Sequence, residues 1–173
     1  MTVPGQPKRA FQPLLPPGRH YMTMAALEEL TVKRFPASIV RPAIFSEFRR
    51  LVTDLITTGI VGEIWTDGSF LTEKAEPEVD DMDLSVRVTV EHFETHPLPV
   101  RQRLLYALGG GKRYSPVLDT YITVIFPKGD PRVHGGTDDY WAEKWLMGWD
   151  DKLKGFAVIL LGETDLGFQL HAR

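Results

Sequence analysis

One long amphipathic segment constrains the fold of this chain more than any other feature. Residues 41–59 read RPAIFSEFRRLVTDLITTG, and the apolar side chains recur at the three- and four-residue spacing of one helical face: Ile44, Phe45, Phe48, Leu51, Val52, Leu55 and Ile56. Gly59 is a natural end for this helix, because glycine readily adopts the left-handed conformation that closes helices. An apolar helical face must be buried against another layer, and short β-branched runs elsewhere in the chain predict a sheet that buries it.

The remaining segments alternate between helical and extended patterns. Thr23 is a plausible N-cap for a helix over residues 24–34, because threonine oxygen accepts from helix amides. Further helices are expected over residues 97–108 and 137–150, and strands within residues 60–68, 82–90, 117–126 and 155–162. This order predicts an α/β (α+β) fold in which helices flank a mixed central β-sheet of about four to five strands.

The length of 173 residues fits one domain. Residues 1–19 hold five of the thirteen prolines and little periodicity, which is typical of an extended segment rather than a helix. We therefore expect a proline-rich N-terminal arm over residues 1–20 and a single domain over residues 21–173.

Composition excludes several classes of function. The chain has no cysteine, so disulfides, thiolate metal sites and cysteine nucleophiles are absent, and metal ligands must be oxygen or imidazole. A formal net charge of -3 gives no global basic footprint for nucleic acid. The N-terminus lacks the apolar run of a secretory signal, and no stretch of about 18 apolar residues predicts a membrane span. A cytoplasmic protein without membrane contact is the expectation.

Three acidic residues form the candidate centre. Asp81 and Asp83 lie two positions apart at the start of the strand within residues 82–90, so their side chains project to the same face. Carboxylates are the ligands that magnesium prefers, and a third acid from a neighbouring strand would complete a two-metal site. Asp119 is the best candidate for that third acid. Gly68 and Ser69 follow the strand within residues 60–68, where a glycine lets the backbone approach phosphate and a hydroxyl donates to it.

Taken singly, these signals also have simpler explanations. A Gly-Ser turn is common, and two alternating aspartates usually mark a solvated strand end rather than a metal site. The assembled order is more specific: a strand, Gly68-Ser69, an eleven-residue spacer, then acid, apolar, acid, apolar over residues 81–84 and a β-branched run.

This order resembles the signature of the DNA polymerase beta-like nucleotidyltransferase superfamily. The phrases LPPGRHYMT, EIWTDGSFLTEK, LDTYITVIFPKGDP and LKGFAVILLG are also similar to those of small stand-alone prokaryotic nucleotidyltransferase-like proteins, so that the resemblance covers most of the chain. It implies a minimal nucleotidyltransferase fold. The additional helical domain of many larger members has no room here, which leaves substrate choice open.

The resemblance also implies roles for individual residues. Gly68 and Ser69 take the nucleotide-phosphate role, Asp81 and Asp83 are ligands of Mg²⁺ or Mn²⁺, and Asp119 is the third carboxylate, which helps to deprotonate the acceptor. The implied activity is of the EC 2.7.7 type: a nucleoside monophosphate passes from a nucleoside triphosphate to a hydroxyl of an RNA end, a protein side chain or a small molecule.

Four basic residues are candidates for contact with the triphosphate, because ammonium and guanidinium groups bind phosphate: Lys74, Lys112, Arg113 and Lys154. For each of them a merely solvated side chain is the competing interpretation. Lys74 lies in the motif loop and Lys154 just before Gly155, and these two are our candidates for nucleotide binding.

A non-catalytic module is the alternative from another class. The protein would then bind a nucleotide or a partner protein, for example as one component of a toxin-antitoxin pair. Trp141, Trp145 and Trp149 recur every four residues, so they form one stripe on the predicted helix over residues 137–150. Core packing or a partner surface is favoured for this stripe over base stacking.

Overall fold

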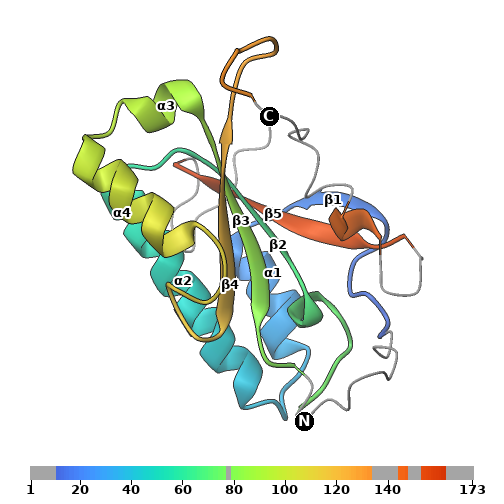
Figure 1. The fold of residues 1–173 in the computed structure, drawn as a ribbon. Coiled ribbons are helices and arrows are strands. Elements are labelled where there is room, and N and C mark those ends of the chain that lie inside the picture. Colours follow the sequence, from blue (N-terminus) through green and yellow to red (C-terminus); the bar gives the residue numbers. More distant parts are fainter. Residues whose placement is uncertain (1–10, 77–78, 134–143, 148–152, 163–173) are drawn as a thin grey trace, which may run out of the picture.

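The fold was obtained as a computed structural model, which describes residues 11–76, 79–133, 144–147 and 153–162. Within these residues, helices pack against a mixed five-stranded sheet (Figure 1), which confirms the expected fold class. The helical elements are α1 (Met24–Glu28), η1 (Glu29–Lys33), α2 (Val40–Thr58), η2 (Ser69–Leu71), α3 (Val90–Glu94) and α4 (Leu98–Leu108). The strands are β1 (Gly18–Tyr21), β2 (Gly62–Asp67), β3 (Met82–Thr89), β4 (Leu118–Ile125) and β5 (Gly155–Leu161).

The sheet has the order β1-β5-β2-β3-β4. The pairs β1·β5 and β3·β4 are parallel, whereas β5·β2 and β2·β3 are antiparallel. β5, the last strand of the described residues, thus lies between β1 and β2. β1 begins inside the proline-rich arm that was expected over residues 1–20, and residues 1–10 of that arm lie outside the described residues.

α2 is the predicted long helix, and its ends have separate causes. Gly59 closes it at φ 84°, and the Ile60 amide donates to the Leu55 carbonyl at 2.9 Å. The N-terminal end is capped by the Glu76 carboxylate, which accepts from the amides of Ile39 and Val40 at 2.9 and 2.8 Å. A hydrogen bond from the Ser38 hydroxyl at 2.7 Å, followed by these two, lowers the pKa of Glu76. A residue that far along the chain could not be recognised as the cap from local sequence.

The predicted helix over residues 24–34 appears as α1 continued by the π-helical turn η1. Thr23 caps α1, because its side-chain oxygen accepts from the Ala26 amide at 3.0 Å. The predicted helix over residues 97–108 corresponds to α4. Most of the segment expected as a helix over residues 137–150 lies outside the described residues, which include 144–146 of it as helical.

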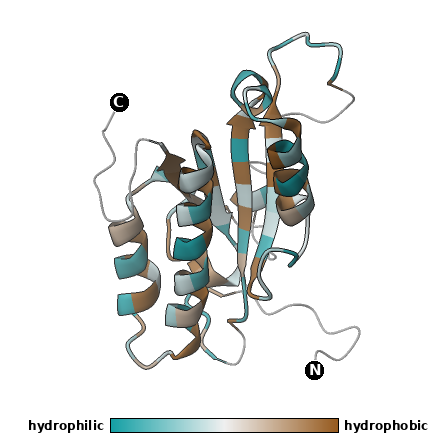
Figure 2. Ribbon diagram, turned by 90° about the vertical axis from the view of Figure 1, so that its left-hand side faces the viewer, coloured by the Kyte–Doolittle hydropathy of each residue, from teal (hydrophilic) through white to brown (hydrophobic). Residues whose placement is uncertain are grey.

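The two faces of the sheet have different partners. Ile64, Leu84 and Val86 belong to the main apolar core, together with buried side chains of α2. Figure 2 shows the alternation of apolar and polar bands along the helices that this packing requires. Residues at the alternating positions of the same strands face the other side of the sheet. There a second cluster contains Trp65, Trp145, Phe156 and Val158.

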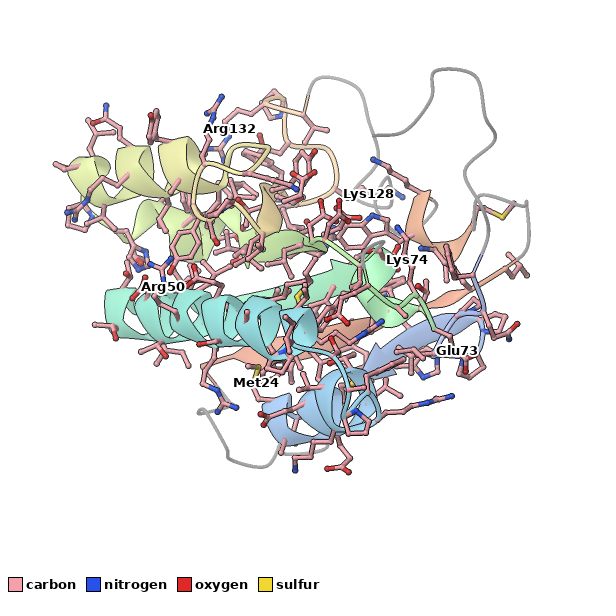
Figure 3. The ribbon with its side chains drawn as sticks, turned by 90° about the horizontal axis from the view of Figure 1, so that it is seen from below. Met24, Arg50, Glu73, Lys74, Lys128 and Arg132 are labelled. Atoms are coloured by element: carbon pink, nitrogen blue, oxygen red, sulfur yellow. The ribbon has the colours of Figure 1, made fainter. Side chains whose placement is uncertain are left out.

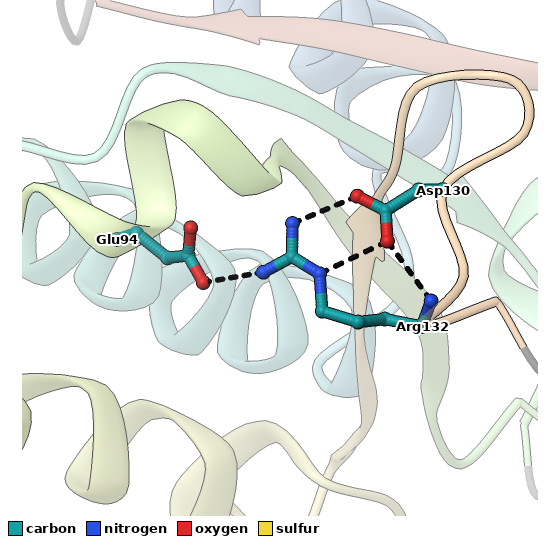
Figure 4. A network of polar contacts seen from close by, with 3 residues as sticks. All are labelled: Glu94, Asp130 and Arg132. Carbon is teal, nitrogen blue, oxygen red and sulfur yellow. Dashed lines mark hydrogen bonds and ion pairs between the residues drawn. The ribbon is translucent and has the colours of Figure 1, made fainter.

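A salt-bridged turn fixes the loop after β4 beside α3 (Figure 4). The Arg132 guanidinium donates to Glu94 at 2.8 Å and to both carboxylate oxygens of Asp130, at 3.0 and 2.8 Å. These hydrogen bonds lower the pKa of Asp130 to about 2. Among the described residues, none of the helices has both the length and the apolar character needed to cross a membrane.

Candidate active site

Three aspartates form one row across neighbouring strands. Asp67 at the end of β2 is paired in register with Asp83 on β3, and Asp83 is paired with Asp119 on β4. Residues directly opposite each other on paired strands project to the same face. The row therefore lies on the side of the sheet away from α2. The sequence predicted Asp83 and Asp119 as neighbours, and the parallel pairing of β3 and β4 places them side by side.

Asp81 lies just before β3 and connects this row to two loops. Its carboxylate forms an ion pair with the Lys112 ammonium at 2.8 Å, and its carbonyl accepts from the Ser69 hydroxyl at 3.3 Å. Lys112 belongs to the glycine-rich loop between α4 and β4. The Gly-Ser turn and the glycine-rich loop thus meet at one residue, the turn at the Asp81 carbonyl and the loop at its carboxylate.

Gly68 is required by its geometry at the end of β2. It has φ 86° and ψ -164°, a region that is essentially restricted to glycine. A Cβ atom there would lie 2.6 Å from Asp83 Oδ2 and 3.2 Å from the Asp83 amide nitrogen. The absence of a side chain therefore lets the Gly-Ser turn pack directly against the central carboxylate of the row.

Replacing Gly68 with alanine is expected to destabilise the fold by about 2–3 kcal/mol, near the upper end of the usual cost of such backbone strain. Gly111→Ala is the matched control, because Gly111 also has a positive φ of 77° but has nothing within 4 Å of a Cβ. That control should cost only about 1 kcal/mol. Urea unfolding curves measure both values, and equal losses would show that contact with Asp83 contributes nothing.

Burial and mutual repulsion disfavour the ionised forms of two of these acids. Burial raises the pKa of Asp67 to about 7, although Lys154 at 2.5 Å opposes this shift. Burial, followed by repulsion from Asp81 and Asp119, raises the pKa of Asp83 to about 6. One carboxylate oxygen of Asp67 and one of Asp119 are buried without a hydrogen-bond partner among the described residues. The row therefore has oxygen atoms to spare for a cation, and a cation bound there would favour the ionised forms.

The carboxylate oxygens of these acids are suitable ligands for a hard divalent cation, but the side chains do not point to one common position. Within the described part of the chain, no group of three or more acidic or histidine side chains is arranged so that it could hold a metal ion. The Asp81 carboxylate is paired with Lys112 instead. Without a metal ion, the carboxylates repel one another and stay apart, and lysines balance their negative charge. The sequence predicted these acids on one face. For their carboxylates to bind one ion together, Asp81 would have to give up its ion pair with Lys112.

The two lysines proposed for nucleotide binding lie in different surroundings. Lys154 is largely buried and pairs with Asp67, the member of the row on β2. Lys74 lies in the loop after η2 (Figure 3), with its ammonium 5.7 Å from the centre of the Phe11 ring. Its carbonyl accepts from Arg41 at 2.8 Å. The contacts of Lys74 thus place it against the N-terminal segment rather than the carboxylates.

Asp67 was not identified from the sequence as a site residue. The available signal was its position directly before Gly68-Ser69, at the end of the expected strand within residues 60–68. The stripe of Trp141, Trp145 and Trp149 was predicted to be either core or a partner surface. Trp145 is buried against Phe156, whereas the other two lie outside the described residues.

Residues 7–160 match a family of unknown function, DUF6932, which covers most of the chain. The chain therefore belongs to this family. Comparison with curated proteins and with solved structures finds no match.

Proposed function

We propose that this member of the DUF6932 family is a metal-dependent nucleotidyltransferase, which transfers a nucleoside monophosphate from a nucleoside triphosphate to a hydroxyl acceptor. The observation that carries the proposal is the contact of the Gly68-Ser69 turn with a registered row of carboxylates. Gly68 lies against Asp83, and Asp119 flanks Asp83 on the next strand. The turn has a backbone that can approach a phosphate group, and the acids beside it can hold the metal ion that accompanies the phosphate.

The acids would hold Mg²⁺ or Mn²⁺ beside the turn. Asp83 and Asp119 are neighbours in register, and Asp81 would join them when it leaves Lys112. A divalent ion bound there would neutralise phosphate charge and polarise the reacting oxygen.

The residues of the chain itself have separate tasks in this reaction. The Ser69 hydroxyl, now on the Asp81 carbonyl at 3.3 Å, would donate to a phosphate oxygen. The Lys154 ammonium would supply positive charge from the other side of the row. Asp119, one oxygen of which has no hydrogen-bond partner among the described residues, would accept the proton of the acceptor hydroxyl. The acceptor oxygen then bonds to the α-phosphorus as the bond to pyrophosphate breaks.

A partner-binding module is the second candidate, and α4 is the observation that favours it. Leu98, Leu105 and Tyr106 on this helix are 56%, 45% and 72% exposed. Pro99 and Arg103 help to line an open hollow beside Tyr106. Exposed apolar side chains on one helix are typical of protein contact surfaces. A partner protein could bind there with or without transfer at the carboxylate row.

The deciding experiment incubates the purified chain with each α-labelled nucleoside triphosphate and Mg²⁺ or Mn²⁺. Total RNA, a protein lysate or the chain alone serves as the acceptor. We expect label on one acceptor class with the unaltered chain, at least about tenfold less with Asp119→Asn because the general base is lost, and no loss with Asp54→Asn. Asp54 lies on α2 and accepts from the Tyr114 hydroxyl, so it controls for the substitution itself. Nucleotide binding without any transfer would favour the binding module.

A further inference from the structure

The carboxylate row and the adjacent Asp81 are already paired with lysines of the chain itself. Asp67, Asp81, Asp83 and Asp119 supply four negative charges when ionised, and two lysines are ion-paired within the group. Lys154 Nζ lies 2.5 Å from Asp67 Oδ2, and Lys112 Nζ lies 2.8 Å from Asp81 Oδ2. Four carboxylates and two paired ammonium groups leave two negative charges, the charge that one divalent ion balances. Among the described residues, Asp80 adds a negative charge near Lys112, and the exposed Lys144 adds a positive charge near Asp83, so these two leave the balance unchanged.

The two ion pairs differ in how easily they can dissociate. The side chains of Lys154 and Asp67 are 14% and 3% exposed, whereas those of Lys112 and Asp81 are 42% and 22% exposed. Removing one partner of a buried pair leaves an uncompensated charge away from water, whereas an exposed lysine returns to solvent at little cost. The Lys154 pair is therefore permanent and the Lys112 pair exchangeable.

The backbone around each lysine agrees with this difference. The Lys154 amide donates to the Leu146 carbonyl at 2.9 Å, and Gly155, the next residue, begins β5. A Cβ at Gly155 would lie 2.1 Å from the Pro16 carbonyl, so the chain is tightly packed there. Lys112 instead follows Gly111, where an added Cβ would meet none of the described residues within 4 Å.

We infer that Lys154, held in place by Asp67, is a built-in cation that substitutes for a second metal ion, so that the site binds one divalent ion rather than two. Lys112 is the cation that this ion displaces from Asp81. The inference rests on the proposed function, because it specifies how the same site balances the charge of the carboxylates and of a bound triphosphate. From the sequence, three acids were expected to form a two-metal centre. In this inference the positive charge of the Lys154 ammonium replaces the charge of one of those two ions.

Lysine labelling of the unaltered chain tests the exchange directly. An amine-reactive acetylating reagent is applied with and without Mg²⁺, and mass spectrometry reads each lysine separately. We expect the labelling of Lys112 to rise several-fold with Mg²⁺ while Lys154 stays protected in both states. Increased labelling of Lys154 would overturn the inference, because it would show that metal displaces the buried lysine. Unchanged labelling of Lys112 would equally contradict the exchange.

Counting bound Mn²⁺ by electron paramagnetic resonance tests the stoichiometry. We expect one ion per unaltered chain, one in Lys154→Arg, which keeps the charge, and one, bound more tightly, in Lys112→Met. Lys154→Met should bind two ions, because Asp67 then becomes available as a ligand. Circular dichroism establishes whether that variant folds, and the labelling experiment decides if it does not.

The outcomes separate this inference from the proposed function. Two ions on the unaltered chain, with nucleotidyl transfer intact, would overturn the role of Lys154 and leave the function standing. A folded Lys154→Met chain that still binds one ion would do the same. No Mn²⁺ binding by the unaltered chain, together with no transfer, would remove the metal-dependent function itself.

Discussion

Replacing Asp83 with asparagine is expected to reduce the proposed nucleotidyl transfer by at least about a hundredfold, because the central carboxylate of the row, the proposed metal ligand, loses its charge. The same substitution should stabilise the metal-free fold at pH 8, by about 1–3 kcal/mol. Burial and the repulsion from Asp81 and Asp119 raise the pKa of Asp83 to about 6, so that its ionised form opposes folding. Loss of activity together with a gain in stability is the signature of a residue kept for function.

The pH dependence of this stability gain follows from the direction of the pKa shift. The Asp83 carboxyl holds its proton up to about pH 6 in the folded chain, whereas an unfolded chain releases it near the ordinary value of 3.8. The folded state thus binds more protons between these values, and its stability falls as pH rises through the interval. Asp83→Asn lacks this term, so its advantage should be absent below about pH 4 and complete above about pH 6.

Urea unfolding in the presence of EDTA, at pH 4 and pH 8, measures the effect for the unaltered and variant chains. Asp54→Asn is the control, since Asp54 lies on the exposed side of α2 and its substitution should change neither transfer nor the pH dependence. A destabilised Asp83→Asn chain at pH 8 would show that the carboxylate contributes to the fold, and its activity loss would then say nothing about metal binding.

Local sequence patterns were sufficient for most of the elements. The apolar period of residues 41–59 predicted α2, and Gly59 predicted its end, because both signals act within a few residues. β1 was missed, since four residues after two prolines have no period of their own and become a strand by pairing with β5. The placement of β5 between β1 and β2 likewise depends on contacts far apart in the sequence, which local patterns do not contain.

The candidate site was predictable only in part, for the same reason. Spacing placed Asp81 and Asp83 on one face, and Asp119 was chosen as the acid of the next long strand; the register of β3 and β4 then placed it beside Asp83. Asp67 entered the row through the antiparallel register of β2 and β3, which no motif specifies. The pairing of Lys154 with Asp67 arises from strand order, whereas Lys74, which is nearer to the motif in sequence, points its ammonium toward Phe11.

One buried arginine holds the loop that carries the Gly-Ser turn. The Arg41 side chain is fully buried in the first turn of α2, and its guanidinium donates to four carbonyls at 2.7–3.0 Å, those of Thr31, Phe70, Thr72 and Lys74. Burial lowers the pKa of Arg41 to about 10. Its guanidinium also lies 3.8 Å from the centre of the Phe35 ring. A single side chain thus connects η1 and α2 to the loop that follows β2.

Arg41→Met is expected to destabilise the fold by about 3–5 kcal/mol, because methionine fills much of the volume but leaves buried carbonyls without donors. Arg49→Met is the matched control on the same helix. Arg49 also lies over a phenylalanine ring, at 5.4 Å, but its side chain is 41% exposed and its partner is the Glu28 carboxylate. Removing such an exposed pair should cost less than about 1 kcal/mol.

Chemical unfolding of both variants gives the comparison, and hydrogen exchange locates it. The amides of residues 70–74 should lose protection in Arg41→Met and keep it in Arg49→Met, because Arg41 donates to carbonyls of that loop, whereas Arg49 is paired with Glu28. Transfer activity should fall in Arg41→Met even under conditions where the chain stays folded, since the loop positions Ser69 against Asp81. Similar stability losses in the two variants would mean that the four carbonyls find other donors, and that Arg41 does not support the turn.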